Sequence, residues 1–444
     1  MTKKQLGLSV MKKFNNSFDI VGKKNYGIDL KRSLKSAFKN SKFYKNKLKK
    51  YKDIKLNAKE FEKIPFTTKK ELLNDQKLNP PFGDNLSVNV SKIQRVHRTS
   101  GTTDRPLILA LTKNDVELMT ETGSTCSKIS GLKEKDTVVH CLNYCMWMGG
   151  LTDHMSLEKS GAAVIPYGVG NSKQLIETIL NLKVNTISCT PSYLNKLIYV
   201  LREFYEIEPK QLGLKLGLLG TEGGLQDPKY REKIENLWGI KAINFNYGMA
   251  EVWSVFGSEC FKCQKGLNFI SNGNLYLELI DPKTSKNIDI ENGSEGEMVV
   301  TTLRKEAQPI IRYRTGDIIK VNNTNSCKCG HKGIKFDVVG RSDDMLTIKG
   351  INVFPSQIRT IINSYLDKLS GQFQIILDKP LPIDNLVLKI EKAEGATSIE
   401  LEILKNKLIS EFKSNLYVLP QIDFVSHGSL TADGTKSKLI KKNY

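Results

Sequence analysis

The segment GRSDDMLTIKGINVFPSQI, residues 340–358, divides the chain into two regions with different sequence patterns. On its N-terminal side, apolar runs separated by turn residues predict a mostly β subdomain that begins near residue 270. On its C-terminal side, the pattern predicts the order strand, helix, strand, strand, helix, strand. That order indicates a small α+β domain, and we place the domain boundary between residues 342 and 343.

Further toward the N-terminus, residues 30–75 are expected to be helical, and short apolar runs then alternate with helix-like stretches. The apolar runs are LILAL (107–111), TVVHCL (137–142), AAVIP (162–166), NTISCT (185–190), LKLGLLG (214–220) and AINFN (242–246). Strands that alternate with helices are typical of a parallel, wound α/β sheet. The sequence therefore predicts an α/β protein in which residues 1–342 form a large domain and residues 343–444 form a small one.

The chain has 444 residues and a formal net charge of +20, carried mostly by Lys. The length predicts two or three domains. No apolar stretch reaches the roughly 18 residues that a membrane span needs, so we expect a cytoplasmic protein with no membrane partner.

The positive charge suits an anionic partner such as nucleic acid, a nucleotide or an acidic carrier protein. We favour the alternative, cations spread over solvated faces, because the Lys residues are scattered along the chain. The densest cluster, KFYKNKLKKYK (42–52), alternates aromatic and basic residues, but it is also typical of an amphipathic helix. Nucleic acid binding is therefore not expected.

A hydroxyl-rich turn precedes the first apolar run, in HRTSGTTDRPLILALT (97–112). Ser100, Thr102 and Thr103 surround Gly101, so backbone N–H groups and hydroxyls can face an anion there. The segment lacks the pattern of a Walker A loop. A polar turn before a strand is the alternative interpretation.

Two carboxylates follow predicted strands. In NYGMAE (246–251), Glu251 lies just beyond a tight turn, where a carboxylate can bind Mg²⁺ and so assist a triphosphate. In IIRYRTGDII (310–319), Asp317 lies at a Gly turn, and an acceptor-only carboxylate suits two ribose hydroxyls. A solvated Glu and an ordinary turn Asp are the alternatives.

Two close cysteine pairs stand out among eight cysteines. SECFKCQKGLNF (258–269) and SCKCGH (326–331) contain a C-x-x-C and a C-x-C spacing. Four thiolates can close a tetrahedral zinc site, and free thiols are the alternative. The remaining cysteines are expected to be small core residues; they are Cys126, Cys141, Cys145 and Cys189.

Five segments in this order resemble the adenylate-forming (acyl-CoA synthetase) superfamily: residues 97–112, 246–251, 310–319, 340–358 and GTKSK at 434–438. Within the superfamily, the chain is similar to the phenylacetate–CoA ligases, also through FYKNKL (43–48), IPFTTKKEL (64–72) and PSYL (191–194). The resemblance implies a large adenylate-forming domain, with a wound α/β part and a β part, and a small mobile α+β domain.

The same resemblance implies an ATP-dependent carboxylic acid–CoA ligase that forms an acyl adenylate and then a thioester. The acid would be an aryl acid, phenylacetate-like or benzoate-like, and the reaction would use ATP, Mg²⁺ and CoA. The alternative acceptor is the phosphopantetheine arm of an acyl carrier protein. A carrier protein and a homodimer are the protein partners left open.

Nucleotide-binding residues follow from the family's motifs. The resemblance places the ATP phosphates at Ser100, Gly101, Thr102 and Thr103, and the adenine at Gly220, Thr221, Glu222, Tyr247 and Gly248. The family usually has Gly then Lys where this chain has Asp104 and Arg105. Arg keeps the positive charge, whereas Asp104 adds a carboxylate near the phosphates.

By the same likeness, Glu251 would bind Mg²⁺, Asp317 would hold the ribose and Arg341 would lie on the path to the phosphates. Asp343 matches the hinge position about which the small domain rotates between two half-reactions. A catalytically inactive binding module on this fold would show damaged motifs, whereas these residues are all present.

A C-terminal Lys stabilises the charge that builds up during adenylation in this superfamily. Lys436 in TKSKLI aligns with that Lys, although Thr435 replaces the family's usual Gly. Lys438, two residues further on, is the alternative.

The acid is expected near NYCMWMGGL (143–151), because the family has a similar aromatic and Gly-rich stretch that lines an aryl pocket. Tyr144 and Trp147 would form walls, and Gly149 and Gly150 would leave room. The alternative is that these are core residues between a strand and a helix.

Some phenylacetate–CoA ligases also resemble this chain at the cysteine pairs, with a His where this chain has Asn268. Because Asn is a poor zinc ligand, Cys263 would complete a set with Cys260, Cys327 and Cys329. His331 is the second choice. Four thiolates leave no open position, so the expected zinc is structural.

Overall fold

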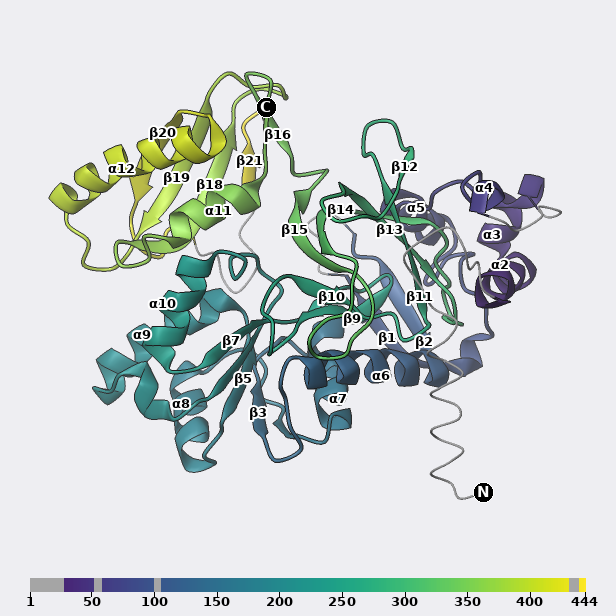
Figure 1. Ribbon diagram of the computed structural model, residues 1–444, viewed down its shortest axis with the longest axis horizontal. Helices are drawn as coiled ribbons and strands as arrows, with labels where there is room; N and C mark the ends of the chain where they lie inside the picture. Colours follow the sequence, from purple (N-terminus) through teal and green to yellow (C-terminus); the bar gives the residue numbers. More distant parts are fainter. Residues whose placement is uncertain (1–27, 52–57, 100–104, 431–438) are drawn as a thin grey trace. The chain divides into compact units, whose positions relative to one another are not determined.

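The structure is a computed structural model that describes residues 28–51, 58–99, 105–430 and 439–444 (Figure 1). The chain divides into two compact units. The first comprises Met1–Cys189, Leu214–Gly220 and Ile243–Asp337, and the second comprises Thr190–Gly213, Thr221–Ala242 and Val338–Tyr444. The boundary expected between residues 342 and 343 falls inside the last segment of the second unit and stays a prediction.

A five-stranded sheet confirms the wound α/β part. Its order is β4 (Ala163–Ile165), β3 (Thr137–His140), β5 (Thr186–Cys189), β6 (Leu216–Leu219) and β7 (Lys241–Asn244). The pairs β4–β3, β3–β5 and β5–β6 are parallel. Strands β5 and β6 are buried at every residue, which is why their sequences are apolar without alternation. The helices that alternate with the strands in the first unit are α6 (Lys113–Ile129), α7 (Met148–Lys159) and α8 (Ser172–Asn181).

Strand β2 corrects one expectation. The run LILAL was expected to join the parallel sheet, but β2 (Ile108–Thr112) pairs antiparallel with β1 (Ile93–Arg98) in a separate two-stranded sheet. A short connection joins the two strands, and parallel pairing would need a crossover of a dozen or more residues. An apolar run therefore predicted a buried strand correctly but not the partner of that strand.

The N-terminal helices agree with the amphipathic interpretation of KFYKNKLKKYK over residues 42–51, and Lys52 lies outside the described residues. They are α2 (Ile28–Asn40), α3 (Lys42–Lys47), a 3₁₀ turn (Lys49–Tyr51), α4 (Ala58–Phe61) and α5 (Lys69–Leu78). Tyr44 and Leu48 are buried in a core that also contains Leu34 and Ile311, while the Lys residues of α3 face solvent or pair with acids. No helix in the described ranges is long and apolar enough to span a bilayer.

An eight-stranded sheet confirms the β subdomain of the first unit. Its order is β12 (Asn287–Ile288), β11 (Leu275–Ile280), β13 (Glu295–Thr302), β14 (Tyr313–Asn323), β15 (Lys335–Arg341), β10 (Leu267–Phe269), β9 (Trp253–Glu259) and β8 (Tyr247–Met249). The pairs β11–β13, β13–β14 and β8–β9 are antiparallel. The sheet brings NYGMAE at β8 and RYRTGD at β14 into one structure.

Arg312 ties the N-terminal helices to this sheet. Its guanidinium forms an ion pair with Glu278 at 3.0 Å, and the two side chains are only 1% and 4% exposed. The same group donates to the carbonyl of Ile64 at 2.6 Å and lies over the ring of Phe66, 4.1 Å from its centroid. The start of β14 is thereby fixed five residues before Asp317.

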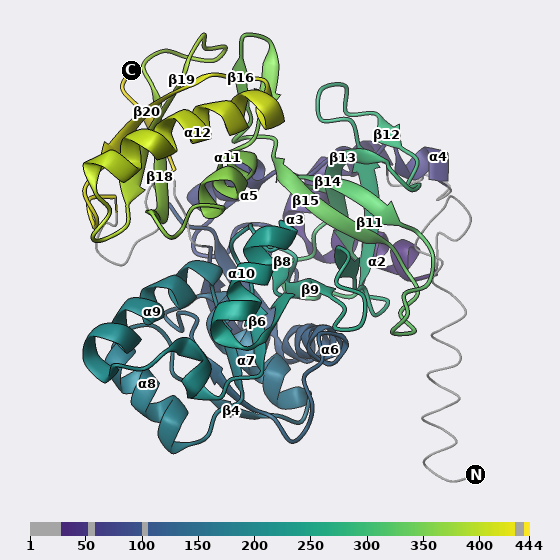
Figure 2. The ribbon, with the colours of Figure 1, turned by 60° about the vertical axis from the view of Figure 1, so that its left-hand side comes forward.

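The second unit contains the predicted α+β domain (Figure 2). Its four-stranded sheet has the order β20 (Pro420–Val425), β19 (Leu386–Lys392), β18 (Leu369–Leu377) and β21 (Ile440–Lys442). Other elements of the unit are the hairpin β16 (Leu346–Ile348) and β17 (Ile351–Val353), and the helices α9 (Pro191–Tyr205), α10 (Pro228–Trp238), α11 (Pro355–Asn363) and α12 (Ser398–Leu416). Ile358, Ile375 and Leu408 share one core, so α11 and α12 pack with the sheet. The predicted strand and helix order is confirmed, with one strand added to the first hairpin and one at the end.

Candidate active site

Residues on either side of the predicted phosphate loop are hydrogen-bonded to each other. Ser100, Gly101, Thr102, Thr103 and Asp104 lie outside the described residues. On either side of them, the Thr99 N–H donates to the Leu107 carbonyl at 3.0 Å, and the Leu107 N–H donates to Thr99 Oγ1 at 3.1 Å. These two hydrogen bonds join the end of β1 to the start of β2.

Tyr247 and Asp317, both predicted to hold the nucleoside, are brought into contact. The Tyr247 hydroxyl donates to Asp317 Oδ2 at 2.8 Å. The Tyr247 ring also packs edge-on against Phe256 and Phe336, with centroids 5.3 Å and 5.2 Å away. Two segments 70 residues apart therefore meet through a hydrogen bond in a largely apolar setting.

Gly248 and Gly220 are required by close backbone approaches. A Cβ at Gly248 would lie 1.8 Å from the Ser254 carbonyl oxygen across the β8–β9 pair. A Cβ at Gly220 would lie 1.8 Å from the Phe245 carbonyl oxygen. At both positions any other residue would push the backbones apart, which is a structural reason for Gly beside any role toward a nucleotide.

Thr221 and Glu222 lie in the second unit, and Glu222 contacts the start of helix α9. Thr221 has a positive φ of 64°. The Glu222 carboxylate accepts hydrogen bonds from the Ser192 hydroxyl at 2.9 Å and from the Ser192 N–H at 3.2 Å. Glu222 thus satisfies an N–H group in the first turn of the helix, which a carboxylate does well at that end.

Glu251 is buried, not solvated. Its carboxylate lies 3.0 Å from the Lys69 ammonium, and its main-chain carbonyl accepts a hydrogen bond from the buried Lys305 ammonium at 2.6 Å. The turn that carries it is closed by the Val252 N–H, which donates to the Met249 carbonyl at 3.0 Å. A carboxylate is a ligand type that divalent cations accept, and in this structure its partner is the Lys69 ammonium.

Arg341 and Asp343, the predicted phosphate and hinge residues, form a bidentate pair in the second unit. The two contacts, Nε to Oδ1 and Nη2 to Oδ2, are both 2.9 Å. Lys436 and its alternative Lys438 lie outside the described residues.

The predicted acid segment folds around His140, which the sequence did not point to. The buried His140 ring bonds to the carbonyls of Gly149 and Gly150 through Nε2, at 3.0 Å and 3.2 Å. Burial lowers the pKa of His140 to about 4, so the ring is neutral and its Nε2 carries the hydrogen that these carbonyls accept. Tyr144 packs edge-on against this ring and bonds to His154 Nδ1 at 3.0 Å, while Trp147 is the half-buried N-cap of α7.

Asp153 on α7 is a second residue that the sequence did not single out. Asn246 Nδ2 donates to its Oδ2 at 2.5 Å, and the Ser254 hydroxyl donates to its Oδ1. Burial raises the pKa of Asp153 to about 7. Because Asn246 precedes Tyr247, Asp153 connects the helix that follows the acid segment to the strand of the predicted adenine residue.

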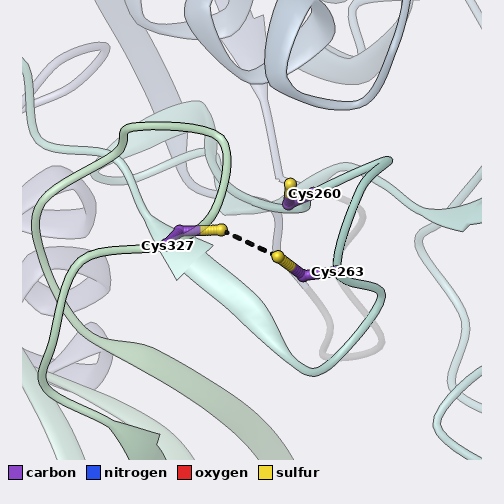
Figure 3. A group of neighbouring side chains, drawn as sticks. All are labelled: Cys260, Cys263 and Cys327. Atoms are coloured by element: carbon purple, nitrogen blue, oxygen red, sulfur yellow. Dashed lines mark hydrogen bonds between the residues drawn. The ribbon is translucent and has the colours of Figure 1, made fainter.

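Three of the four predicted zinc ligands gather in one place (Figure 3). The sulfur atoms of Cys260, Cys263 and Cys327 lie within 4.8 Å of one another, and those of Cys263 and Cys327 are 3.3 Å apart. Cys329 interacts through its side chain with Cys260 and Cys327. His331 Nε2 instead faces the Phe269 carbonyl at 3.0 Å, so the second-choice ligand is engaged elsewhere.

The thiols of this cluster differ in acidity. Burial opposes ionisation of Cys327, but hydrogen bonds from the Cys329 backbone and from neighbouring side chains, Lys335 among them, lower its pKa to about 6. Burial raises the pKa of Cys260 to about 12. A cluster of close thiols is a donor set that fits a thiophilic metal ion.

Comparisons with known proteins agree with this arrangement. A profile of the AMP-binding enzyme family matches residues 71–302, and one of the AMP-binding enzyme C-terminal domain matches residues 350–443. The chain is 35% identical to a phenylacetate–coenzyme A ligase from Aromatoleum evansii over 76% of this chain and 73% of the relative. It is 30% identical to a phenylacetate–coenzyme A ligase from Escherichia coli strain K12 over 90% of each.

Among solved structures, the chain is similar to 2-hydroxyisobutyryl-CoA ligase in the postadenylation state with 2-HIB-AMP. The TM-score is 0.84 and the identity is 25%, with 94% of this chain and 88% of that chain covered. The fold and these relatives define an adenylate-forming enzyme. More narrowly, the chain belongs to the phenylacetate–CoA ligase family, and it is an ATP-dependent, AMP-forming acid–CoA ligase. The comparisons do not favour a carrier protein as the acceptor.

Proposed function

We propose that this ligase activates an aromatic carboxylic acid, phenylacetate-like or benzoate-like, and transfers the acyl group to CoA. The main support for the nucleotide site is the hydrogen bond of 2.8 Å between Tyr247 and Asp317. Both residues lie in the same unit as the buried Glu251. The aromatic preference is supported by the names of the relatives and by the aromatic pair Tyr144 and His140 in the acid segment.

In the first half-reaction, an oxygen of the acid's carboxylate attacks the α-phosphorus of ATP, and the bond to the departing pyrophosphate breaks. Residues Ser100–Thr103 hold the phosphates, Tyr247 lies against the adenine and Asp317 accepts from the ribose hydroxyls. Glu251 would hold Mg²⁺, which would offset phosphate charge. Gly220, Thr221, Glu222 and Gly248 complete the nucleotide site.

In the second half-reaction, the CoA sulfur, having lost its proton, attacks the acyl carbon and the bond to AMP breaks. We assign Lys436 to the first step, where its ammonium stabilises charge at the α-phosphate. Residues 343–444 then act as a mobile lid that turns about Asp343 and withdraws Lys436, while Arg341 stays on the path to the phosphates.

Pyrophosphate release from ATP tests the reaction across a panel of aryl and aliphatic acids. We expect the highest kcat/KM with phenylacetate or benzoate, and thioester formation with free CoA but not with a phosphopantetheinylated carrier protein. A preference for aliphatic acids would overturn the aromatic assignment. Absence of pyrophosphate release with every acid would overturn the catalytic proposal.

The Lys436 assignment is tested by separating the half-reactions. Lys436→Ala should suppress adenylation by roughly 100-fold to 1,000-fold, the range for loss of a group aimed at developing charge. Thiolysis of a supplied acyl adenylate should change little. Lys438→Ala is the matched control, and the opposite pattern in the two variants would move the role to Lys438.

We propose a structural zinc ion held by Cys260, Cys263, Cys327 and Cys329. Its support is the sulfur cluster, which joins the segment after β9 to the segment after β14. Purified enzyme should contain about one equivalent of zinc, and less than about 0.2 equivalents in undamaged protein would contradict a tight site. Cys263→Ser should lose zinc, whereas Cys145→Ser, outside the cluster, should retain it.

We also propose the cytoplasm as the location, because ATP and CoA are supplied there. A homodimer is the assembly to test, by light scattering of the purified enzyme at several concentrations. A mass of about one chain, 50.0 kDa, at every concentration would contradict a dimer.

A further inference from the structure

Lys305 has an unusual environment for a lysine. It lies in the connection between β13 and β14, only 6% exposed, and its ammonium donates to the Glu251 carbonyl oxygen at 2.6 Å. A buried ammonium is unfavourable unless nearby groups compensate for its lost hydration. The acceptor belongs to the turn from Met249 to Val252, so the Lys305 ammonium contacts the turn that contains Glu251.

The connection that carries Lys305 is itself held by the start of helix α6. The Asp115 carboxylate accepts from the Glu306 N–H at 2.7 Å and from the Ala307 N–H at 3.0 Å. Thr112, the N-cap of α6, donates through its hydroxyl to the Glu306 carboxylate at 2.8 Å. The backbone on the C-terminal side of Lys305 is thereby fixed.

The same connection is attached to strand β2, which follows the predicted phosphate loop. Gln308 Oε1 accepts from the Ala110 N–H at 2.9 Å, and Gln308 Nε2 donates to the Phe82 carbonyl at 2.9 Å. Residues 305–308 therefore link the strand after the phosphate loop to the turn that carries Glu251.

The two lysines near Glu251 act on different parts of it. Lys69 lies 3.0 Å from the carboxylate and is 42% exposed, so it can move away when a cation binds. Lys305 instead holds the main-chain carbonyl and is enclosed. The cavity beside it, lined by Asp75, Glu251 and Lys305 among others, has a volume of only about 10 Å³, enough for about one water molecule.

We propose that Lys305 is a positioning residue that fixes the Glu251 turn relative to strand β2 and thereby sets the divalent-cation requirement of adenylation. The inference rests on the proposed role of Glu251. Because the hydrogen bond of Lys305 goes to that turn, its loss should weaken cation binding more than it weakens acid binding or thioester formation.

The test is Lys305→Met, which keeps the side-chain length and removes the ammonium. The Mg²⁺ concentration for half-maximal pyrophosphate release should rise roughly 10-fold to 100-fold, the range for loss of a group that orients a metal ligand without binding the metal itself. A second readout is free of turnover: calorimetric binding of Mn²⁺ with a non-hydrolysable ATP analogue should weaken by a similar factor. KM for the acid and thiolysis of a supplied acyl adenylate should stay within about twofold, because the Lys305 ammonium is enclosed and bonds to the Glu251 turn.

Lys305→Arg and Arg304→Met separate the alternatives. Lys305→Arg keeps the charge and should recover part of the cation affinity, and it serves if Lys305→Met fails to fold. Arg304→Met removes an exposed cation one residue away and should behave as wild type.

A shifted melting temperature with an unchanged Mg²⁺ profile in Lys305→Met and Lys305→Arg would overturn the inference and leave Lys305 a structural residue. An equal fall in both half-reactions would do the same. If the wild type releases no pyrophosphate with any acid, the proposed function fails instead, and the Mn²⁺ binding comparison still decides whether Lys305 supports a cation site.

Discussion

Two arginine–carboxylate pairs in this enzyme have the same chemistry and opposite surroundings. Arg312 and Glu278, in the first unit, are 1% and 4% exposed, whereas Arg341 and Asp343, in the second, are 43% and 63% exposed. The first pair is enclosed by backbone carbonyls and an aromatic ring and holds one arrangement. The second can exchange partners with water or with a ligand at little cost, which suits residues proposed for a phosphate path and a hinge.

Breaking the enclosed pair should have the largest effect. Arg312→Leu leaves the Glu278 carboxylate buried without its partner, and should lower the free energy of unfolding by about 3–5 kcal/mol in urea titrations. The double variant Arg312→Leu with Glu278→Leu should recover part of that loss, because no unpaired charge remains. A loss below about 1 kcal/mol in the single variant would contradict an enclosed pair.

A buried carboxylate without a cationic partner should make stability depend on pH. The pKa of Asp153 is about 7 in the folded protein against 3.8 for an ordinary Asp. Because the folded pKa is raised, this group's contribution is fully present below about pH 4 and is lost as pH rises through 7.

Asp153→Asn should therefore become more stable relative to wild type as pH rises from 4 to 8, by up to roughly 4 kcal/mol. The amide can keep both contacts, since the Ser254 hydroxyl can accept as well as donate. Unfolding free energies at several pH values measure this difference. A difference that does not change with pH would rule out the raised pKa.

Removing one hydrogen bond in the nucleotide region should have a smaller effect. Tyr247→Phe keeps the ring packing and deprives Asp317 of its phenolic donor, which should cost about 1–3 kcal/mol of stability. KM for ATP should rise, since the carboxylate loses an orienting contact. Tyr199→Phe, on an exposed helix face, is the control and should leave both quantities unchanged.

The exposed pair should show the smallest change in stability. Arg341→Gln should alter the free energy of unfolding by roughly 0–1 kcal/mol, because surface ion pairs contribute little. KM for ATP should nevertheless rise if the guanidinium meets the phosphates. A large loss of stability with an unchanged KM for ATP would show that this pair has a structural role, as the Arg312–Glu278 pair has.

Patterns local in the sequence predicted the fold. Strand and helix alternation indicated the parallel sheet, and the change near residue 340 indicated the small α+β domain. The pairing of β2 with β1 was missed because an apolar run specifies burial and not its partner. The C-x-x-C and C-x-C spacings of the two cysteine pairs indicated a cluster, and Cys260, Cys263 and Cys327 do lie together.

The site depended on contacts that no local pattern contains. Glu251 is buried and its carbonyl accepts from Lys305, 54 residues away, and the contact of Tyr247 with Asp317 spans 70 residues. Asp153 and His140 gave no signal because a single polar residue on a helix or strand looks the same whether buried or exposed. Family likeness placed Tyr247 and Asp317 in one site, but it did not single out Asp153, His140 or Lys305.

The two hydrogen bonds between Thr99 and Leu107 have a consequence for engineering. Because Thr99 and Leu107 bond to each other, substitutions between them should leave the register of β1 and β2 intact. Exchanging Asp104 and Arg105 for the Gly and Lys usual in the family should therefore change how the enzyme handles nucleotide phosphates without unfolding the two strands.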